Sequence, residues 1–154
     1  MLKLLGLGVL FCSLAGMGLS LSATVKREWE LAKELLLLVR RIGSDVRCYK
    51  RPLPEIYDGF EGNLPPVFLE KLKSGDTQEA FSQLDVDPTV SAAALPFFER
   101  VGRCSAQECR LFEEQCTKEL ERLIVQSAET VADKAKMYRS LGLAGGAVVL
   151  ILLL

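Results

Sequence analysis

The chain has 154 residues, a formal net charge of −1 and no histidine, and 49% of its residues are hydrophobic. The near-zero charge excludes the basic excess that is typical of nucleic-acid-binding proteins. The lack of histidine removes the most common general base and every catalytic pairing of serine or cysteine with histidine. The chain also contains neither a GxxxxGK[ST] nor a GxGxxG phosphate loop. We therefore expect no enzymatic activity, no cofactor or metal ion, and no nucleic-acid or small-molecule ligand.

An uncharged apolar run occupies the N-terminus, from Leu4 to Val25, and is closed by Lys26 and Arg27. It exceeds the roughly 20 residues that a helix needs to cross a bilayer. Residues 1–25 are therefore predicted to form a transmembrane helix. The alternative is a secretory signal peptide cleaved near Ser22, although the basic pair directly after the run opposes translocation.

Small residues recur at four-residue steps along this first run, and a glycine pair at the same spacing lies in the apolar run at the C-terminus. Such stripes let helices approach closely in a membrane. We expect helix–helix packing here, for example between the two predicted spans, through Gly8, Cys12, Gly16, Ser20, Gly142 and Gly146.

The residues between the two apolar runs have a helical pattern. Apolar residues recur at three- and four-residue steps, proline and glycine interrupt the pattern, and no alternating period-2 run predicts a strand. The sequence therefore predicts an all-α bundle of about six helices, in which the long first and last helices pair antiparallel. The expected helices cover residues 26–49, 55–60, 65–74, 76–84, 89–101 and 105–140.

Two sequences resemble capping boxes, in which an N-cap side chain and a carboxylate three residues later satisfy free N–H groups reciprocally. They begin at Asp76 and at Ser105. Asp85 and Asp87 are predicted to form a turn and to cap a helix, and Pro96 to kink or restart the helix around it.

The last helix has no clear breaker before the apolar C-terminal run, so it is expected to continue into it. The 14 uncharged residues 141–154 rise only about 21 Å as a helix. A span that starts at Met137 reaches nearly 27 Å if Arg139 extends to the headgroups. Residues 137–154 are therefore predicted to form a second transmembrane helix, with Tyr138 and Arg139 at the interface. The alternative is a tail that packs on the soluble domain or lies in the membrane interface.

Basic residues follow the first apolar run and precede the second, whereas only Lys3 and the N-terminal amine are basic on the other side. The positive-inside rule then predicts a cytosolic central domain, residues 26–136, with Lys26 and Arg27 at the membrane interface. The alternative keeps the domain outside the cell as a helical binding module with a cleaved signal peptide and a C-terminal anchor.

Four of the five cysteines, Cys48, Cys104, Cys109 and Cys116, lie in the central domain. Their spacing fits no usual zinc motif. An even number suits disulfides in a secreted protein, but in the cytosol we expect free thiols that mostly pack as small buried residues.

Several segments together resemble the stage III sporulation protein AB family. They are the leading Met-Leu-Lys-Leu-Leu-Gly, Pro52-Leu53-Pro54-Glu55, Phe97-x4-Gly102-Arg103 and the ending Lys136-Met-Tyr-Arg-Ser-Leu-Gly-Leu-x-Gly-Gly. The resemblance covers nearly the whole chain. Arg51, where the family often has threonine, and Cys104-Ser105, where it commonly has Ser-Asp, depart from the pattern.

The resemblance implies a membrane component of the channel-like complex that links mother cell and forespore in endospore formers. It also implies a soluble domain similar to the cytoplasmic domain of the platform protein of type II secretion and type IV pilus systems. The expected partners are the lipid bilayer, other membrane components of the complex and a cytosolic ATPase, in the mother-cell membrane around the forespore. From their charge and expected exposure we interpret Arg47, Lys50, Arg51 and Glu55 as the edge that faces the ATPase.

Overall fold

The computed structural model describes residues 2–48 and 51–153, and in these ranges all of its regular secondary structure is α-helical, with turns and loops between the helices and no strands. The all-α prediction is confirmed. Six helices are described: α1 (Leu2–Cys48), α2 (Leu53–Asp58), α3 (Pro66–Ser74), α4 (Thr77–Ser82), α5 (Pro88–Arg100) and α6 (Ala106–Leu153). The side chains that are not described within these ranges are those of residues 2–12, 14, 15, 18, 47, 48, 106, 143, 146, 149, 150, 152 and 153.

The chain divides into two compact units. The central unit comprises residues 28–126, and the terminal unit combines residues 1–27 with residues 127–154. The domain boundaries predicted from the sequence lie between residues 25 and 26 and between residues 136 and 137. Over the described residues, no helix combines the length and the apolar character that crossing a membrane requires.

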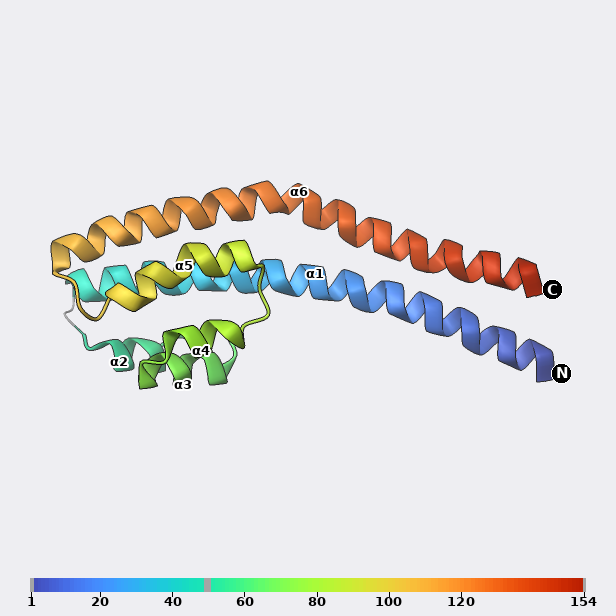
Figure 1. Cartoon of the computed structure of the whole chain (residues 1–154), viewed down its shortest axis with the longest axis horizontal. Helices are drawn as coiled ribbons and strands as arrows, with labels where there is room; N and C mark the ends of the chain where they lie inside the picture. The colour runs from blue at the N-terminus through green and yellow to red at the C-terminus, as the bar shows by residue number, and fades with distance from the viewer. Residues whose placement is uncertain (1, 49–50, 154) are drawn as a thin grey trace. The chain divides into compact units, whose positions relative to one another are not determined.

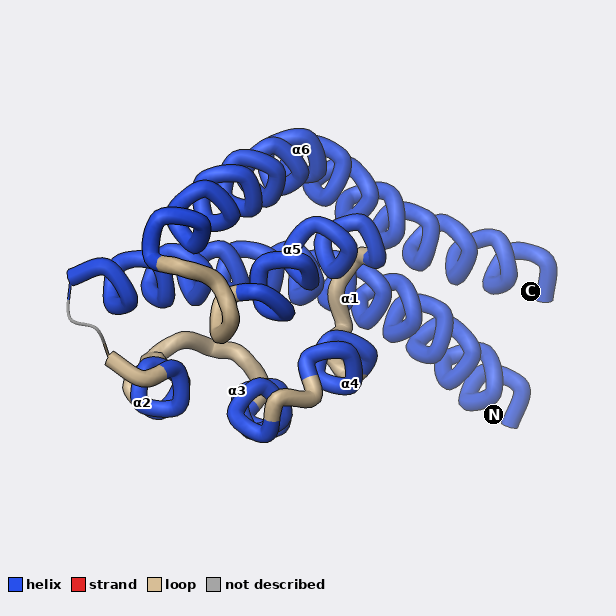
Figure 2. The backbone as a smooth tube through the Cα atoms, turned by 60° about the vertical axis from the view of Figure 1, so that its left-hand side comes forward, coloured by secondary structure: helices blue, strands red, loops and turns tan. Residues whose placement is uncertain are grey.

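Within the central unit, α6 and the group of short helices α2, α3 and α4 lie on opposite sides of α1 and α5 (Figure 1 and Figure 2). Helix α1 supplies the middle of the core, because its apolar residues recur at three- and four-residue steps and form a wide apolar face. Four of its side chains are completely inaccessible to solvent: Leu35, Leu38, Val39 and Ile42.

The central parts of α1 and α6 run antiparallel, as predicted. The indole Nε1 of Trp29, early in this part of α1, donates a hydrogen bond of 3.2 Å to the carbonyl of Ile124, late in this part of α6. Further along α1, Gly43 lies directly against the buried Glu113, and a Cβ atom at Gly43 would collide with that carboxylate. The missing side chain at Gly43 therefore leaves room for the end of the Glu113 side chain, despite the cost of glycine in a helix.

Four phenylalanine side chains join the short helices to α5. Phe68 of α3 and Phe81 of α4 meet edge to face, with ring centroids 5.3 Å apart. Phe98 of α5 lies 5.4 Å from Phe81 and also 5.4 Å from Phe97. Such aromatic contacts add to the free energy gained by burying the rings.

Proline and glycine begin and end the short helices as predicted. Pro54 lies in the first turn of α2, where its missing N–H is not needed, and Gly59 caps that helix. Gly75 ends α3 with φ of 86°, a left-handed conformation that favours glycine. Helix α5 continues through Pro96, so that residue does not restart the helix.

The capping box predicted at Asp76 is wrong. The Asp76 side chain caps no N–H of α4, and Glu79 instead accepts a hydrogen bond of 2.8 Å from Lys71 Nζ. The reason lies in the preceding helix: the Asp76 N–H donates to the Lys71 carbonyl and the Gly75 N–H to the Leu72 carbonyl. These are the two bonds of a Schellman motif, and they use the N–H group that a capping box would need.

The second capping box, at the start of α6, is confirmed. The Glu108 N–H donates to Ser105 Oγ at 3.3 Å, and the Ser105 N–H donates to Glu108 Oε2 at 2.9 Å. The Ser105 N–H and the Ser105 hydroxyl both donate to the Glu108 carboxylate, and these two bonds hold the pKa of Glu108 below its usual value. Asp87 caps α5 in the predicted manner, because its side chain accepts the Thr89 N–H at 2.8 Å.

Candidate partner-binding surface

The described side chains form no evident catalytic or metal-binding site. Among them, no three His, Cys, Asp or Glu residues lie close enough together to hold a metal ion. Cys109 and Cys116 are buried free thiols, as expected, and Cys104 is a half-buried free thiol. Burial raises the pKa of Cys116 to about 12, so this thiol is a packing residue and a poor nucleophile. The described part of the chain thus offers surfaces on which a partner could bind.

The predicted ATPase-facing edge lies at the junction of α1 and α2. Arg47 belongs to the last turn of α1, but its side chain is not described, and Lys50 lies outside the described residues. Arg51 and Glu55 are both exposed, four residues apart at the start of α2. The edge therefore stays a prediction that rests on these two exposed side chains and on the sequence.

The residues predicted at the membrane interface are mostly exposed. Lys26, Arg27 and Arg139 are exposed and Tyr138 is half-buried. Their contact with a membrane stays a prediction.

The small-residue stripe of α1 is not buried where its side chains are described. Gly16 is exposed, with nothing within 4 Å of the position that a Cβ atom would take, and Ser20 is exposed. Ser22, on a different face, is buried. Gly142 is half-buried, whereas Gly8, Cys12 and Gly146 lie outside the described side chains. Packing along the stripe stays a prediction.

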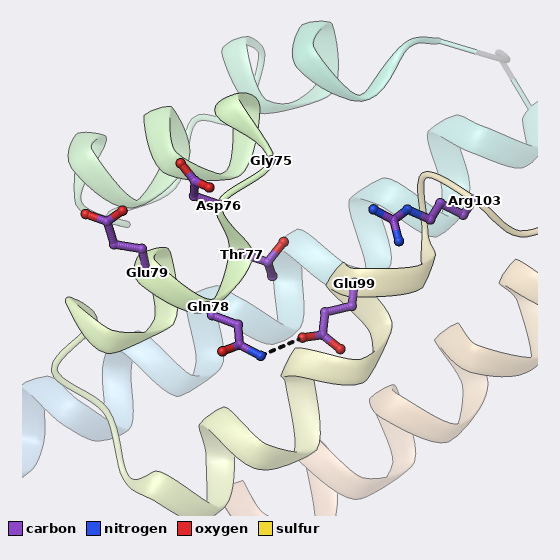
Figure 3. Close-up of a pocket in the computed structure, with 7 residues that line it drawn as sticks. All are labelled: Gly75, Asp76, Thr77, Gln78, Glu79, Glu99 and Arg103. Atoms are coloured by element: carbon purple, nitrogen blue, oxygen red, sulfur yellow. Dashed lines mark hydrogen bonds between the residues drawn. The ribbon is translucent and has the colours of Figure 1, made fainter.

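A polar depression of about 490 Å³ lies between the α3–α4 turn and the end of α5. Figure 3 shows Thr77 and Gln78 on one side of it and Glu99 and Arg103 on the other. Gln78 Nε2 donates a hydrogen bond of 3.3 Å to Glu99 Oε1 across the gap. In the described part of the chain, the exposed guanidinium of Arg103 forms no ion pair, so it is available to a partner.

Acidic side chains line the rest of this depression. Asp76 and Glu79 are both exposed, and Glu79 is paired with Lys71 at 2.8 Å. The hydrogen bond to Glu79 raises the pKa of Lys71, so the lysine stays charged at every physiological pH. The surface is therefore polar and mainly acidic, and it contains no enclosed site where a reaction could be shielded from water.

No local pattern in the sequence predicts this depression, because its residues come from two separate helices and two turns. Two parts of it were predicted to have other roles: Asp76 and Glu79 as a capping box, and Arg103 as part of the Gly102-Arg103 pair of the family resemblance. The distribution of charge along the chain could have indicated this acidic surface. The net charge of −1 does not show it, because that value averages regions of opposite sign.

Comparison with known families decides the identity. The family model described as stage III sporulation protein AB matches residues 3–154. The chain belongs to this family. Membership implies a role in spore formation, and the family is not a known enzyme family. Neither a curated protein nor a solved structure matches the chain significantly.

Proposed function

We propose that this protein is a non-enzymatic membrane platform component of the complex that connects mother cell and forespore. In this proposal a cytosolic ATPase of the secretion type acts on the central unit, which transmits its action to the membrane assembly. Family membership over residues 3–154 is the observation that carries the sporulation role. The coupling role is inferred from the family resemblance and from the layout of the chain.

The layout supports membrane attachment at both ends. Residues 4–25 and 141–154 are uncharged, and basic residues flank both runs. Large apolar side chains in these segments are exposed within the single chain, including Leu19 at 57% and Leu141 at 58%. Exposed apolar surface of this extent is characteristic of segments that meet lipid or other helices.

The central unit supports a role in transmitting force or position. It has its own apolar core, and both α1 and α6 enter it as unbroken helices. A packed interior of this kind has low compressibility and moves as a body. The short helices α2 to α5 add exposed surface on which partners can bind.

The ATPase-facing edge is the most direct test of the coupling role. A variant with Arg47→Glu, Lys50→Glu, Arg51→Glu and Glu55→Lys reverses the charges of the edge. We expect it to lose co-purification with the ATPase and to reduce spore yield in an endospore-forming host. The matched control is Arg110→Glu, an exposed residue of α6, which should leave both measurements unchanged. Normal co-purification and spore yield in the charge-reversed variant would show that the edge is wrong.

A further inference from the structure

Negative charge is concentrated in the short helices. Residues 53–100, which contain α2 to α5, have nine acidic and three basic side chains, a difference of −6. Because the whole chain carries −1, the other residues together carry +5. Lys71 and Lys73 are used in ion pairs with Glu79 and Asp58. The surface of the short helices is therefore acidic.

An apolar groove opens on this acidic surface, between α4 and α5. Its volume is about 430 Å³. Phe81 and Leu84 are buried, Val86 and Leu95 are half-buried, and Pro88 is exposed at its edge. A partner's apolar side chain would lie against these apolar residues in a shallow groove.

Acidic side chains adjoin the groove in two places. The exposed Asp85 and Asp87 alternate along the chain with the lining residues Leu84, Val86 and Pro88. Gln78 lines both the groove and the polar depression, whose walls include Asp76, Glu79 and Glu99. Of the described residues that line the groove or the depression, Arg103 is the only basic one.

We propose that the α4–α5 groove binds a segment of a partner protein that combines an apolar anchor with lysine or arginine side chains. The anchor would fill the groove, and its basic neighbours would face the acidic residues beside the groove. Complementary charge gives such an interface its specificity and a faster encounter, while the apolar contact supplies most of the affinity. An anionic membrane surface is disfavoured as the occupant, because the acidic side chains beside the groove are repelled by it.

This inference rests on the proposed function only in taking the protein to work within an assembly. The surface is separate from the predicted ATPase-facing edge, which is basic and lies at the α1–α2 junction. The groove is therefore expected to bind a basic segment, whereas the basic edge is suited to an acidic one.

Site-specific photo-crosslinking in sporulating cells tests the proposal on the full-length chain. A benzophenone amino acid is placed at Val86 in the groove and, in a second variant, at Leu95. The control position is Val125 of α6, which is 73% exposed and outside the groove. We expect adducts from Val86 and Leu95 but not from Val125. The cross-linked partner peptide should contain apolar residues and a net positive charge.

The acidic residues are tested in the same cells. Asp85→Asn with Asp87→Asn removes two charges, and asparagine can keep the cap of α5. We expect adduct yield from Val86 to fall about fivefold, the effect of losing two partly exposed ion pairs. A thermal melt of the purified double variant, with an unchanged midpoint, shows that it is folded.

Four results would overturn the proposed groove. The first two are the absence of an adduct from both Val86 and Leu95, and an equal adduct from Val125. The others are an adduct to an acidic segment, to lipid or to a second copy of this chain, and an adduct yield that the asparagine variant leaves unchanged. If ATPase co-purification persisted while the groove gave no adduct, the groove would be wrong and the proposed function would stand. If co-purification and spore yield survived reversal of the α1–α2 edge, the edge would be wrong instead.

Discussion

The central and terminal units differ in how far they bury their apolar side chains. In the central unit, four apolar side chains of α1 are 0% exposed, and Leu120 of α6 is also 0% exposed. In the terminal unit, Met17 is 63% and Ile151 is 75% exposed, and the buried side chains described there are the small Ser22 and Ala135. Among the described residues, every large apolar side chain that is buried therefore belongs to the central unit.

The difference shows where stability and attachment should come from. Burying a leucine side chain contributes roughly 1.5–3 kcal/mol relative to leaving it exposed. The central unit gains this free energy by itself, whereas the exposed side chains of the terminal unit can gain it only from lipid or from other helices. Mutations in the two units should therefore affect different measurements.

The largest expected effect on folding is in the central unit, where adjacent leucines of α1 form a matched pair. Leu38 is 0% exposed and Leu37 is 52% exposed. Leu38→Ala should lower the free energy of unfolding by about 2–5 kcal/mol, because it leaves a cavity. Leu37→Ala should change it by less than about 0.5 kcal/mol. Chemical denaturation of the full-length protein measures both, and equal losses would contradict the assignment of the core.

A charge in the terminal unit should act on attachment and not on folding. Val148 is exposed in the middle of the apolar C-terminal run. Val148→Arg should reduce recovery in the membrane fraction, because an arginine near the centre of a bilayer costs about 2.5–3.5 kcal/mol on insertion scales. Val148→Leu is the control. If the arginine variant were recovered in the membrane fraction as fully as the parent chain, this segment would not be in contact with lipid.

A smaller effect distinguishes the two predicted capping boxes within the central unit. Ser105→Ala should destabilise the protein by about 1 kcal/mol, because it removes the N-cap of α6. Asp76→Ala should have an effect below about 0.5 kcal/mol, since Asp76 caps nothing through its side chain. Thermal unfolding of the two variants in parallel measures the difference, and the reverse order would contradict both local structures.

The smallest effect depends on pH. Hydrogen bonds from Ser105 lower the pKa of Glu108 in the folded state relative to its ordinary value of 4.5. The stabilisation is therefore complete above the unfolded-state value and is lost as pH falls through the lower folded-state value. Glu108→Gln should lower the melting temperature slightly at pH 7, and the difference from the parent chain should shrink below pH 4.5. A difference that did not change with pH would mean that the charge of Glu108 is not involved.

Helix positions were predictable from the sequence because their signals are local. Apolar spacing indicates the buried face of α1, and Pro54, Gly75 and Ser105 act on the residues beside them. The Asp76 box failed because a neighbouring helix used the same N–H group. A four-residue pattern does not include that competing acceptor.

The candidate surfaces were harder to predict. The basic edge could be proposed because its residues lie close together in the sequence, from Arg47 to Glu55. The α4–α5 groove depends on how Phe81, Val86 and Leu95 come together, which only the fold determines. The acidic character of the short helices was present in the sequence but is hidden when charge is averaged over the whole chain.

The membrane topology is the central claim, and it can be tested in intact sporulating cells with a membrane-impermeant maleimide. Ala92 of α5 is exposed in the central unit, so Ala92→Cys provides an accessible thiol against the background of the parent chain. We predict that this thiol is labelled only after the membrane is permeabilised, in protein recovered from the membrane fraction. Labelling in intact cells, or recovery of the protein in the soluble fraction, would contradict a cytosolic platform anchored at both ends.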